Sequence, residues 1–112
     1  MNRTIKFRGK RLDNFEWIYG DLHHGFLTGN SYINGKELYS ETVGQFTGLY
    51  DKNGTEIYEG DIVIYYASGF ATIEFIAGGF HIVQEEYGFD FMGQMLATIE
   101  VIGNIHDKKE LL

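Results

Sequence analysis

Four histidines are the residues best suited to metal binding or proton transfer: His23, His24, His81 and His106. His23 and His24 are adjacent, so in a strand their side chains would point to opposite faces and could not chelate one ion. His81 and His106 are isolated, and their spacing matches no known pattern of metal ligands. We therefore predict no metal site and no other cofactor, and we expect ordinary surface or hydrogen-bonded histidines.

Carboxylate pairs such as Glu56 with Glu59 could act as a general acid and a general base. In a chain with 16 acidic and 9 basic residues, however, such pairs are expected to be solvated surface charge. The sequence contains neither a Gly-x-Ser-x-Gly nucleophile motif nor a phosphate-binding loop motif. We therefore predict a protein without catalytic residues that is not an enzyme. A pocket that joined His81 or His106 to a carboxylate would revive the enzyme hypothesis.

The basic residues are concentrated near the N-terminus, where five of the nine lie within the first eleven positions. They are Arg3, Lys6, Arg8, Lys10 and Arg11. Two roles remain open for this basic strip: pairing with acidic residues of the same or a neighbouring chain, and binding of nucleic-acid phosphates. The net charge of −7 disfavours the second role, because an acidic body repels phosphate backbones. The same acidic body would permit mimicry of DNA.

Aromatic residues are numerous, with eight tyrosines and nine phenylalanines in 112 residues. Exposed aromatic side chains on small β domains bind peptides or stack on bases. We therefore predict a binding face that contains Tyr58, Tyr65, Tyr66 and Phe70. The alternative is that these side chains fill the core and a subunit interface.

The elements that position these residues are predicted to be short strands. Apolar and polar residues alternate over residues 4–8, with Ile5 and Phe7 on one face and Lys6 and Arg8 on the other. Residues 23–36 are expected to be a loop, and residues 85–96 a loop or one helical turn. The other expected strands are residues 16–22, 43–50, 55–58, 62–66, 71–76, 80–83 and 98–105.

Glycine and asparagine must make the chain reversals, because the chain has 15 glycines and no proline. Asn53-Gly54 predicts a hairpin turn of type I′, in which both central residues take positive φ. Gly78-Gly79 predicts a second hairpin turn. Gly60 is expected to bend the chain before a strand that is apolar on both faces.

The overall prediction is a mainly β domain, either a small barrel or two antiparallel sheets, with a short C-terminal helical turn that begins at Asp107. Residues 1–112 are expected to form one domain, with possible subdomains at 1–43, a hairpin region, and 44–112, a small β-barrel. The chain has no cysteine and no apolar run long enough to span a membrane, and we expect no signal peptide in its first residues. We therefore expect a cytoplasmic protein without membrane association.

The central part of the chain carries a long, specific run of motifs. Residues 42–49 read TVGQFTGL, residues 51–54 read DKNG, and residues 57–63 read IYEGDIV. With residues 5–8 (IKFR), 17–20 (WIYG), 100–105 (EVIGNI) and 110–112 (ELL), this run resembles the YopX family of small bacteriophage and prophage proteins. One departure is Lys108-Lys109, where many members have Asn-Pro before the final ELL.

The resemblance implies a β-rich fold and a phage or prophage protein that acts inside the host cell. The family has no established activity, so it transfers no catalytic residue. We therefore expect a non-enzymatic accessory protein that self-associates into a homo-oligomer or binds a host or phage protein. The alternative is a nucleic-acid-associated module that uses the basic N-terminal strand.

Overall fold

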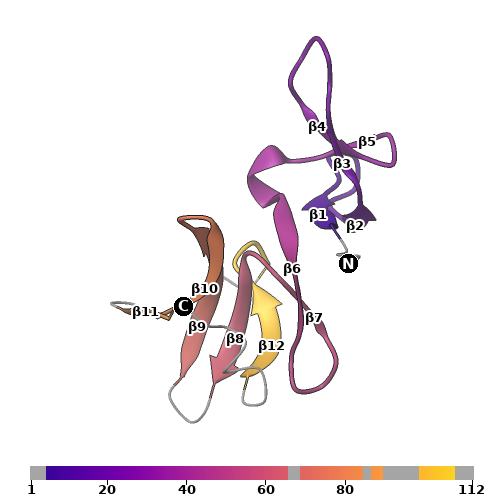
Figure 1. Cartoon of the computed structure of the whole chain (residues 1–112). Helices are drawn as coiled ribbons and strands as arrows, with labels where there is room; N and C mark the ends of the chain where they lie inside the picture. Colours follow the sequence, from indigo (N-terminus) through magenta and orange to yellow (C-terminus); the bar gives the residue numbers. More distant parts are fainter. Residues whose placement is uncertain (1–4, 66–68, 85–86, 90–98, 108–112) are drawn as a thin grey trace. The chain divides into compact units, whose positions relative to one another are not determined.

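The computed structural model describes residues 5–65, 69–84, 87–89 and 99–107 (Figure 1). The chain divides into two compact units, Met1–Phe46 and Thr47–Leu112. The strands form three antiparallel sheets, with the orders β2-β1-β6-β7, β3-β4-β5 and β11-β10-β9-β8-β12. Strand β6, Gly44–Tyr50, contributes residues to both units. The prediction of a mainly β protein is confirmed.

The first unit opens with the predicted hairpin. β1, Phe7–Lys10, pairs antiparallel with β2, Trp17–Gly20, and the start of β6 pairs with the other edge of β1. Side chains alternate across β1, which places Lys6, Arg8 and Lys10 on one face of the strand.

The prediction of a loop over residues 23–36 is wrong, because this segment forms most of a three-stranded sheet. Its strands are β3, Leu22–His24, β4, Ser31–Ile33, and β5, Lys36–Glu37. Asn34 and Gly35 connect β4 to β5, and both take positive φ, at 50° and 75°. They make the tight two-residue turn that their residue types favour. A 3₁₀ turn, Ser40–Thr42, then leads to β6.

The second unit contains the five-stranded sheet. Strand β8 lies between β9 and β12, and Ile62 and Val63 are fully buried on opposite faces of β8. The predicted strand that is apolar on both faces is therefore confirmed. The strands are β7, Glu56–Tyr58, β8, Asp61–Tyr65, β9, Phe70–Ile76, β10, Gly79–Gln84, β11, Tyr87–Phe89, and β12, Ile99–Asn104.

The core of this unit is aliphatic. Side chains from several strands meet there, and the buried members are Ile57, Val63, Ala71, Ile73, Ile82 and Ile99. Leu49, Phe80 and Val101 pack against this cluster. The described strands form no closed barrel, so the predicted small barrel is not confirmed. The predicted C-terminal helical turn falls on residues 108–112, outside the described residues. The prediction of a loop or helical turn over 85–96 is wrong at the residues described there, because Tyr87–Phe89 form strand β11 against β10.

Two predicted hairpins are confirmed, but their turns differ from the prediction. At Asn53-Gly54, only Gly54 takes positive φ, because the Asp51 side chain accepts hydrogen bonds from the backbone N–H of Asn53 and Thr55 and shapes a longer turn. The turn between β9 and β10 uses Ala77 and Gly78 rather than Gly78-Gly79.

Candidate protein-interaction surface

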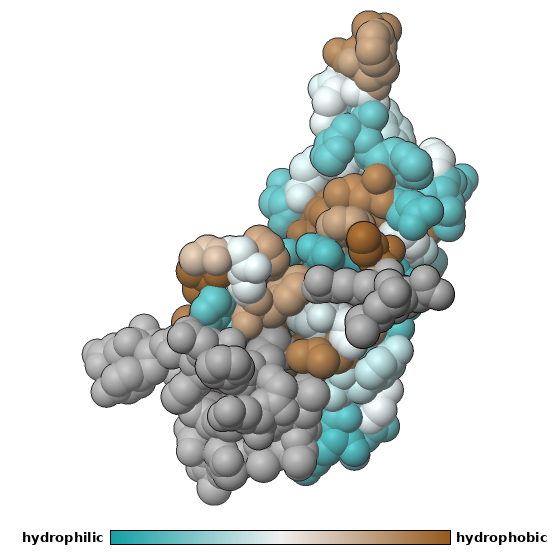
Figure 2. All heavy atoms as spheres, in the orientation of Figure 1, coloured by the Kyte–Doolittle hydropathy of each residue, from teal (hydrophilic) through white to brown (hydrophobic). Residues whose placement is uncertain are grey.

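The end of the β3–β4 hairpin exposes two large apolar side chains. Its connecting loop, residues 25–30, has the sequence GFLTGN. Phe26 is 99% exposed and Leu27 is 91% exposed. Figure 2 shows the resulting hydrophobic surface as the brown cap over the end of this hairpin. We call Phe26 and Leu27 the hairpin tip.

Hydrogen bonds hold the loop that carries the hairpin tip. Gly25 N donates to Asn30 O at 2.8 Å, and Gly29 N donates back to Gly25 O at 2.9 Å. Asn30 N donates to Thr28 Oγ1, and the Asn30 amide donates to Glu37 of β5 at 2.9 Å. The loop is therefore closed at its base and tied to the neighbouring strand. It presents the two side chains from an ordered support, which lowers the entropy lost on binding.

The basic strip lies against aromatic rings in the first unit. The Arg8 guanidinium lies 4.7 Å from the ring centroid of Trp17, and Lys10 Nζ lies 5.6 Å from the same centroid. Lys6 Nζ lies 5.2 Å from the centroid of Phe46. Arg8 is only 6% exposed. This face is therefore a cation–π arrangement in which Arg8 serves packing as well as charge.

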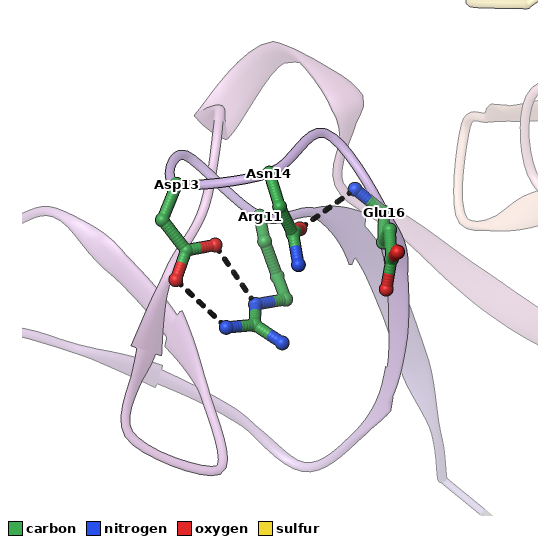
Figure 3. Close-up of polar contacts among 4 residues, drawn as sticks. All are labelled: Arg11, Asp13, Asn14 and Glu16. Carbon is green, nitrogen blue, oxygen red and sulfur yellow. Dashed lines mark hydrogen bonds and ion pairs between the residues drawn. The ribbon is translucent and has the colours of Figure 1, made fainter.

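Arg11 does not join this face, and Arg3 lies outside the described residues. In the β1–β2 loop, Arg11 makes two hydrogen bonds to the Asp13 carboxylate, Nε to Oδ1 at 3.0 Å and a terminal nitrogen to Oδ2 at 2.7 Å (Figure 3). The hydrogen bond from Arg11 lowers the pKa of Asp13. Asn14 Oδ1 accepts a hydrogen bond from Glu16 N and closes the same loop. Arg11 is thus engaged in shaping its own loop.

The four aromatic residues predicted to share a binding face differ in their surroundings. Tyr58 is 2% exposed and its hydroxyl donates to Glu56, so Tyr58 is a core residue rather than a surface residue. Phe70 is exposed at the start of β9. Tyr65 ends β8, and Tyr66 lies outside the described residues.

Two acidic residues of the central motif, Asp51 and Asp61, are structural. Both Asp51 and Asp61 are buried, and both carboxylates accept hydrogen bonds from backbone N–H groups. Asp61 Oδ2 accepts from Tyr58 N at 2.7 Å. Burial works to raise the pKa of Asp51, but hydrogen bonds from the backbone of Val101, Thr55 and Asn53 bring it below its ordinary value. Such carboxylates hold turns, and they are not available to a substrate.

The backbone conformation explains why the same motif has a glycine at position 60. It takes φ of 90°, which side-chain-bearing residues rarely adopt. Its N–H donates to Ile73 O at 2.8 Å, and its carbonyl accepts from Ile105 N at 2.9 Å. Gly60 therefore connects the β7–β8 turn to two other segments of the unit.

The described residues contain no group of three or more histidine or acidic side chains that could hold a metal ion. The ring of His81 lies 3.1 Å, Nδ1 to O, from the carbonyl of Gly79, two residues away. His106 belongs to a turn in which its N–H donates to Asn104 Oδ1. In the part of the chain that the structure describes, no helix is long and apolar enough to cross a membrane.

The sequence does not predict the hairpin tip, because residues 23–36 read as a loop region interrupted only by the apolar pair Tyr32-Ile33. The signal was present: two adjacent large apolar residues, Phe26 and Leu27, stand between glycines in a polar segment. The sequence does not show that the turn directs both side chains away from the core.

The structure is therefore a small, mainly β fold. Its motif residues are buried and hydrogen-bonded to the backbone, and its hairpin tip is apolar and exposed. The family model described as YopX protein matches residues 3–112, and the chain belongs to this family. A similar solved structure is the crystal structure of protein EF1440 from Enterococcus faecalis, with 27% sequence identity and a TM-score of 0.68. The similarity covers 99% of each chain. No curated protein matches the chain.

Proposed function

We propose that this chain is a phage- or prophage-encoded accessory protein that acts without catalysis, by binding a protein through its hairpin tip. The observation that carries the proposal is the nearly complete exposure of Phe26 and Leu27 on an ordered loop. Large apolar side chains exposed together are typical of interaction sites.

The energetics favour a protein pocket as the target of the tip. Full burial of a phenylalanine or a leucine side chain stabilises a complex by about 1.5–3 kcal/mol each. Contributions of this size are characteristic of the few residues that dominate an interface. The hydrogen bonds between Gly25, Gly29 and Asn30 limit the ordering cost of the loop.

Membership of the YopX family supports the phage or prophage origin, and with it action in the cytoplasm of the host cell. A nucleic-acid-associated role has weaker support. Arg8, Lys6 and Lys10 lie against aromatic rings, and Arg11 is paired with Asp13. The four basic residues of the strip that the structure describes are therefore all engaged within the fold. The acidic net charge of −7 also opposes binding to phosphate backbones.

The test identifies the proteins that remain bound to the tagged chain during affinity purification. A tagged chain is co-expressed in bacteria with an untagged copy. The proteins that co-purify with the tagged chain, including the untagged copy, are identified and quantified by mass spectrometry. We expect the wild type and the control Leu12→Ser, which alters an exposed leucine elsewhere, to retain the same protein in stoichiometric amount. We expect Phe26→Ser/Leu27→Ser to lose it. Retention of that protein by the tip variant, or no retained protein with the wild type, would contradict the proposal.

A further inference from the structure

The chain contains two Asn-Gly dipeptides, Asn34-Gly35 and Asn53-Gly54, and each lies in a turn between strands. Asparagine before glycine is especially prone to spontaneous deamidation, because glycine has no side chain to hinder attack by its backbone nitrogen on the neighbouring amide. All four residues are exposed, so the access of water does not distinguish the two turns. Their hydrogen bonds do distinguish them.

Deamidation is a cyclisation followed by hydrolysis. The glycine nitrogen loses its proton to solvent and attacks the side-chain carbonyl carbon of asparagine, so that a C–N bond forms, the bond to the amide nitrogen breaks and ammonia leaves. Water then opens the succinimide ring at either carbonyl. Opening at the side-chain carbonyl gives aspartate, whereas opening at the backbone carbonyl gives isoaspartate, in which the main chain runs through the side chain. A glycine N–H that is held by an acceptor is therefore a poorer nucleophile.

The turn at Asn53-Gly54 holds its nucleophile. Gly54 N donates to the backbone carbonyl of Asp51 at 3.0 Å. Asn53 N and Thr55 N donate to the Asp51 carboxylate at 2.8 and 2.9 Å. Cyclisation would have to break the bond of Gly54 and rotate the neighbouring peptide groups away from the carboxylate. The loss of two such hydrogen bonds slows the reaction at least about tenfold.

The turn at Asn34-Gly35 leaves its nucleophile unbound. These two residues connect the paired positions Ile33 and Lys36, and both take positive φ. In a two-residue turn of this kind, the hydrogen bonds of the ladder join the flanking residues and not the central ones. Among the described residues, none accepts a hydrogen bond from Gly35 N.

We propose that Asn34 is a site of spontaneous deamidation in the folded protein, whereas the fold protects Asn53. The main product is isoaspartate at position 34, which lengthens the two-residue turn between β4 and β5 by one main-chain atom. No cofactor or oxidant is needed, because water is the only other reactant.

The modified turn lies next to the support of the hairpin tip. Glu37 of β5 accepts a hydrogen bond from the side-chain amide of Asn30, at the base of the tip loop, at 2.9 Å. Leu38 N donates to Ser31 O of β4 at 2.9 Å. A longer turn displaces β5 along β4 and weakens both bonds, so deamidation loosens the loop. As regulation of binding, this consequence rests on the proposed function, since it acts on the same tip.

The test follows deamidation of the purified protein in warm, mildly alkaline buffer, both folded and in guanidinium chloride. Trypsin places the two sites in different peptides, because Lys36 and Lys52 lie between them. Mass spectrometry of these peptides gives the modified fraction at each asparagine over time. In the folded protein, Asn34 should convert at least about tenfold faster than Asn53. In denaturant the two rates should be similar, because the hydrogen bonds that protect Asn53 are lost.

Asn34→Gly is the matched control, because Gly-Gly also suits a two-residue turn and has no side-chain amide. Hydrogen exchange of residues 25–30 should be faster in aged wild type than in fresh wild type. Aged Asn34→Gly should exchange like the fresh protein.

Equal rates at the two asparagines of the folded protein, or a faster rate at Asn53, would overturn the inference. So would a folded Asn34 that stays intact while the denatured protein converts. Unchanged hydrogen exchange after conversion of Asn34 would remove the effect on the tip. The proposed function fails by a different result, which is unchanged co-purification of the partner with Phe26→Ser/Leu27→Ser.

Discussion

Asp51 and Val101 are 50 residues apart in the sequence, yet Asp51 Oδ2 accepts a hydrogen bond from Val101 N at 2.8 Å. The other oxygen of the same carboxylate accepts from Asn53 N and Thr55 N at 2.8 and 2.9 Å. One buried side chain thus shapes the turn after β6 and joins it to β12. This relationship explains an acidic residue of the family motif without any chemistry on a substrate.

Substitution of Asp51 should destabilise the second unit. Asp51→Ala leaves three backbone N–H groups without their acceptor, and we expect the free energy of unfolding to fall by about 3 kcal/mol. Urea denaturation followed by circular dichroism measures this change. The control Asp13→Ala removes an exposed carboxylate and should leave the free energy of unfolding almost unchanged. Equal effects of the two substitutions would contradict the structural role of Asp51.

The same carboxylate predicts a dependence of stability on pH. The folded-state pKa of Asp51 lies below the ordinary value of 3.8, so the folded protein binds this proton less readily than the unfolded chain. Its contribution is therefore complete above the unfolded pKa and is lost as pH falls through the folded pKa. We expect the wild type to lose stability as pH falls below about 4, and Asp51→Asn to lack that part of the loss. Parallel pH profiles for the two proteins would show that Asp51 makes no such contribution.

Gly60 should not tolerate a side chain. Its φ of 90° strains any other residue, so we expect Gly60→Ala to lower the free energy of unfolding by about 1–2 kcal/mol. Gly79→Ala is the matched control, because the nearest atom to its added Cβ would be His81 Cε1 at 3.9 Å and its φ is not positive. Thermal unfolding of both variants distinguishes them, and a Gly60→Ala protein as stable as the control would contradict this account.

Arg8 should matter for stability more than Lys6, although both are basic residues of one strand face. Arg8 is buried against Trp17, so Arg8→Ala removes packing as well as a cation–π contact, at a cost of about 2 kcal/mol. Lys6 is more exposed, and Lys6→Ala should cost clearly less. Fluorescence of Trp17, the single tryptophan, reports unfolding of the first unit during denaturation. A larger loss of unfolding free energy for Lys6→Ala than for Arg8→Ala would contradict the packing role of Arg8.

The hairpin tip should be dispensable for folding. Phe26→Ser/Leu27→Ser replaces side chains that are almost wholly exposed, so the free energy of unfolding should change by less than about 0.5 kcal/mol. Denaturation of the variant beside the wild type measures this. A large loss of stability would mean that the tip is part of the protein's own core, and it would remove the basis for an interaction site.

Local patterns predicted much of the fold. The β1–β2 hairpin follows from alternating apolar residues around an Asp-Asn turn, and the β6–β7 and β9–β10 hairpins follow from strand patterns on either side of glycine-containing turns. The exact turns could not be predicted, because they depend on groups outside the turn itself. Asp51 changes the turn at Asn53-Gly54 through its side chain, and Ala77 takes a positive φ that its residue type disfavours. Sheet closure also depends on long-range pairing, which periodicity does not encode.

The candidate site could be predicted only in part. The basic residues on β1 follow from the alternation of their strand, but the burial of Arg8 depends on Trp17 across the hairpin. The sequence leaves Tyr58 either on a binding face or in the core, and its burial in the core depends on how β7 packs. Phe26 and Leu27 are apolar residues whose exposure is decided by the path of the loop, so composition alone did not single them out.

Site-specific photocrosslinking at position 26 tests the central claim most directly. A photoreactive phenylalanine analogue replaces Phe26 in one protein and the exposed Leu12 in the control, and both are irradiated in living cells. The account predicts one discrete protein adduct from position 26 that is absent from position 12 and is lost when Leu27→Ser is added. The same pattern of adducts from both positions, or none from position 26, would contradict the claim that the hairpin tip binds a protein.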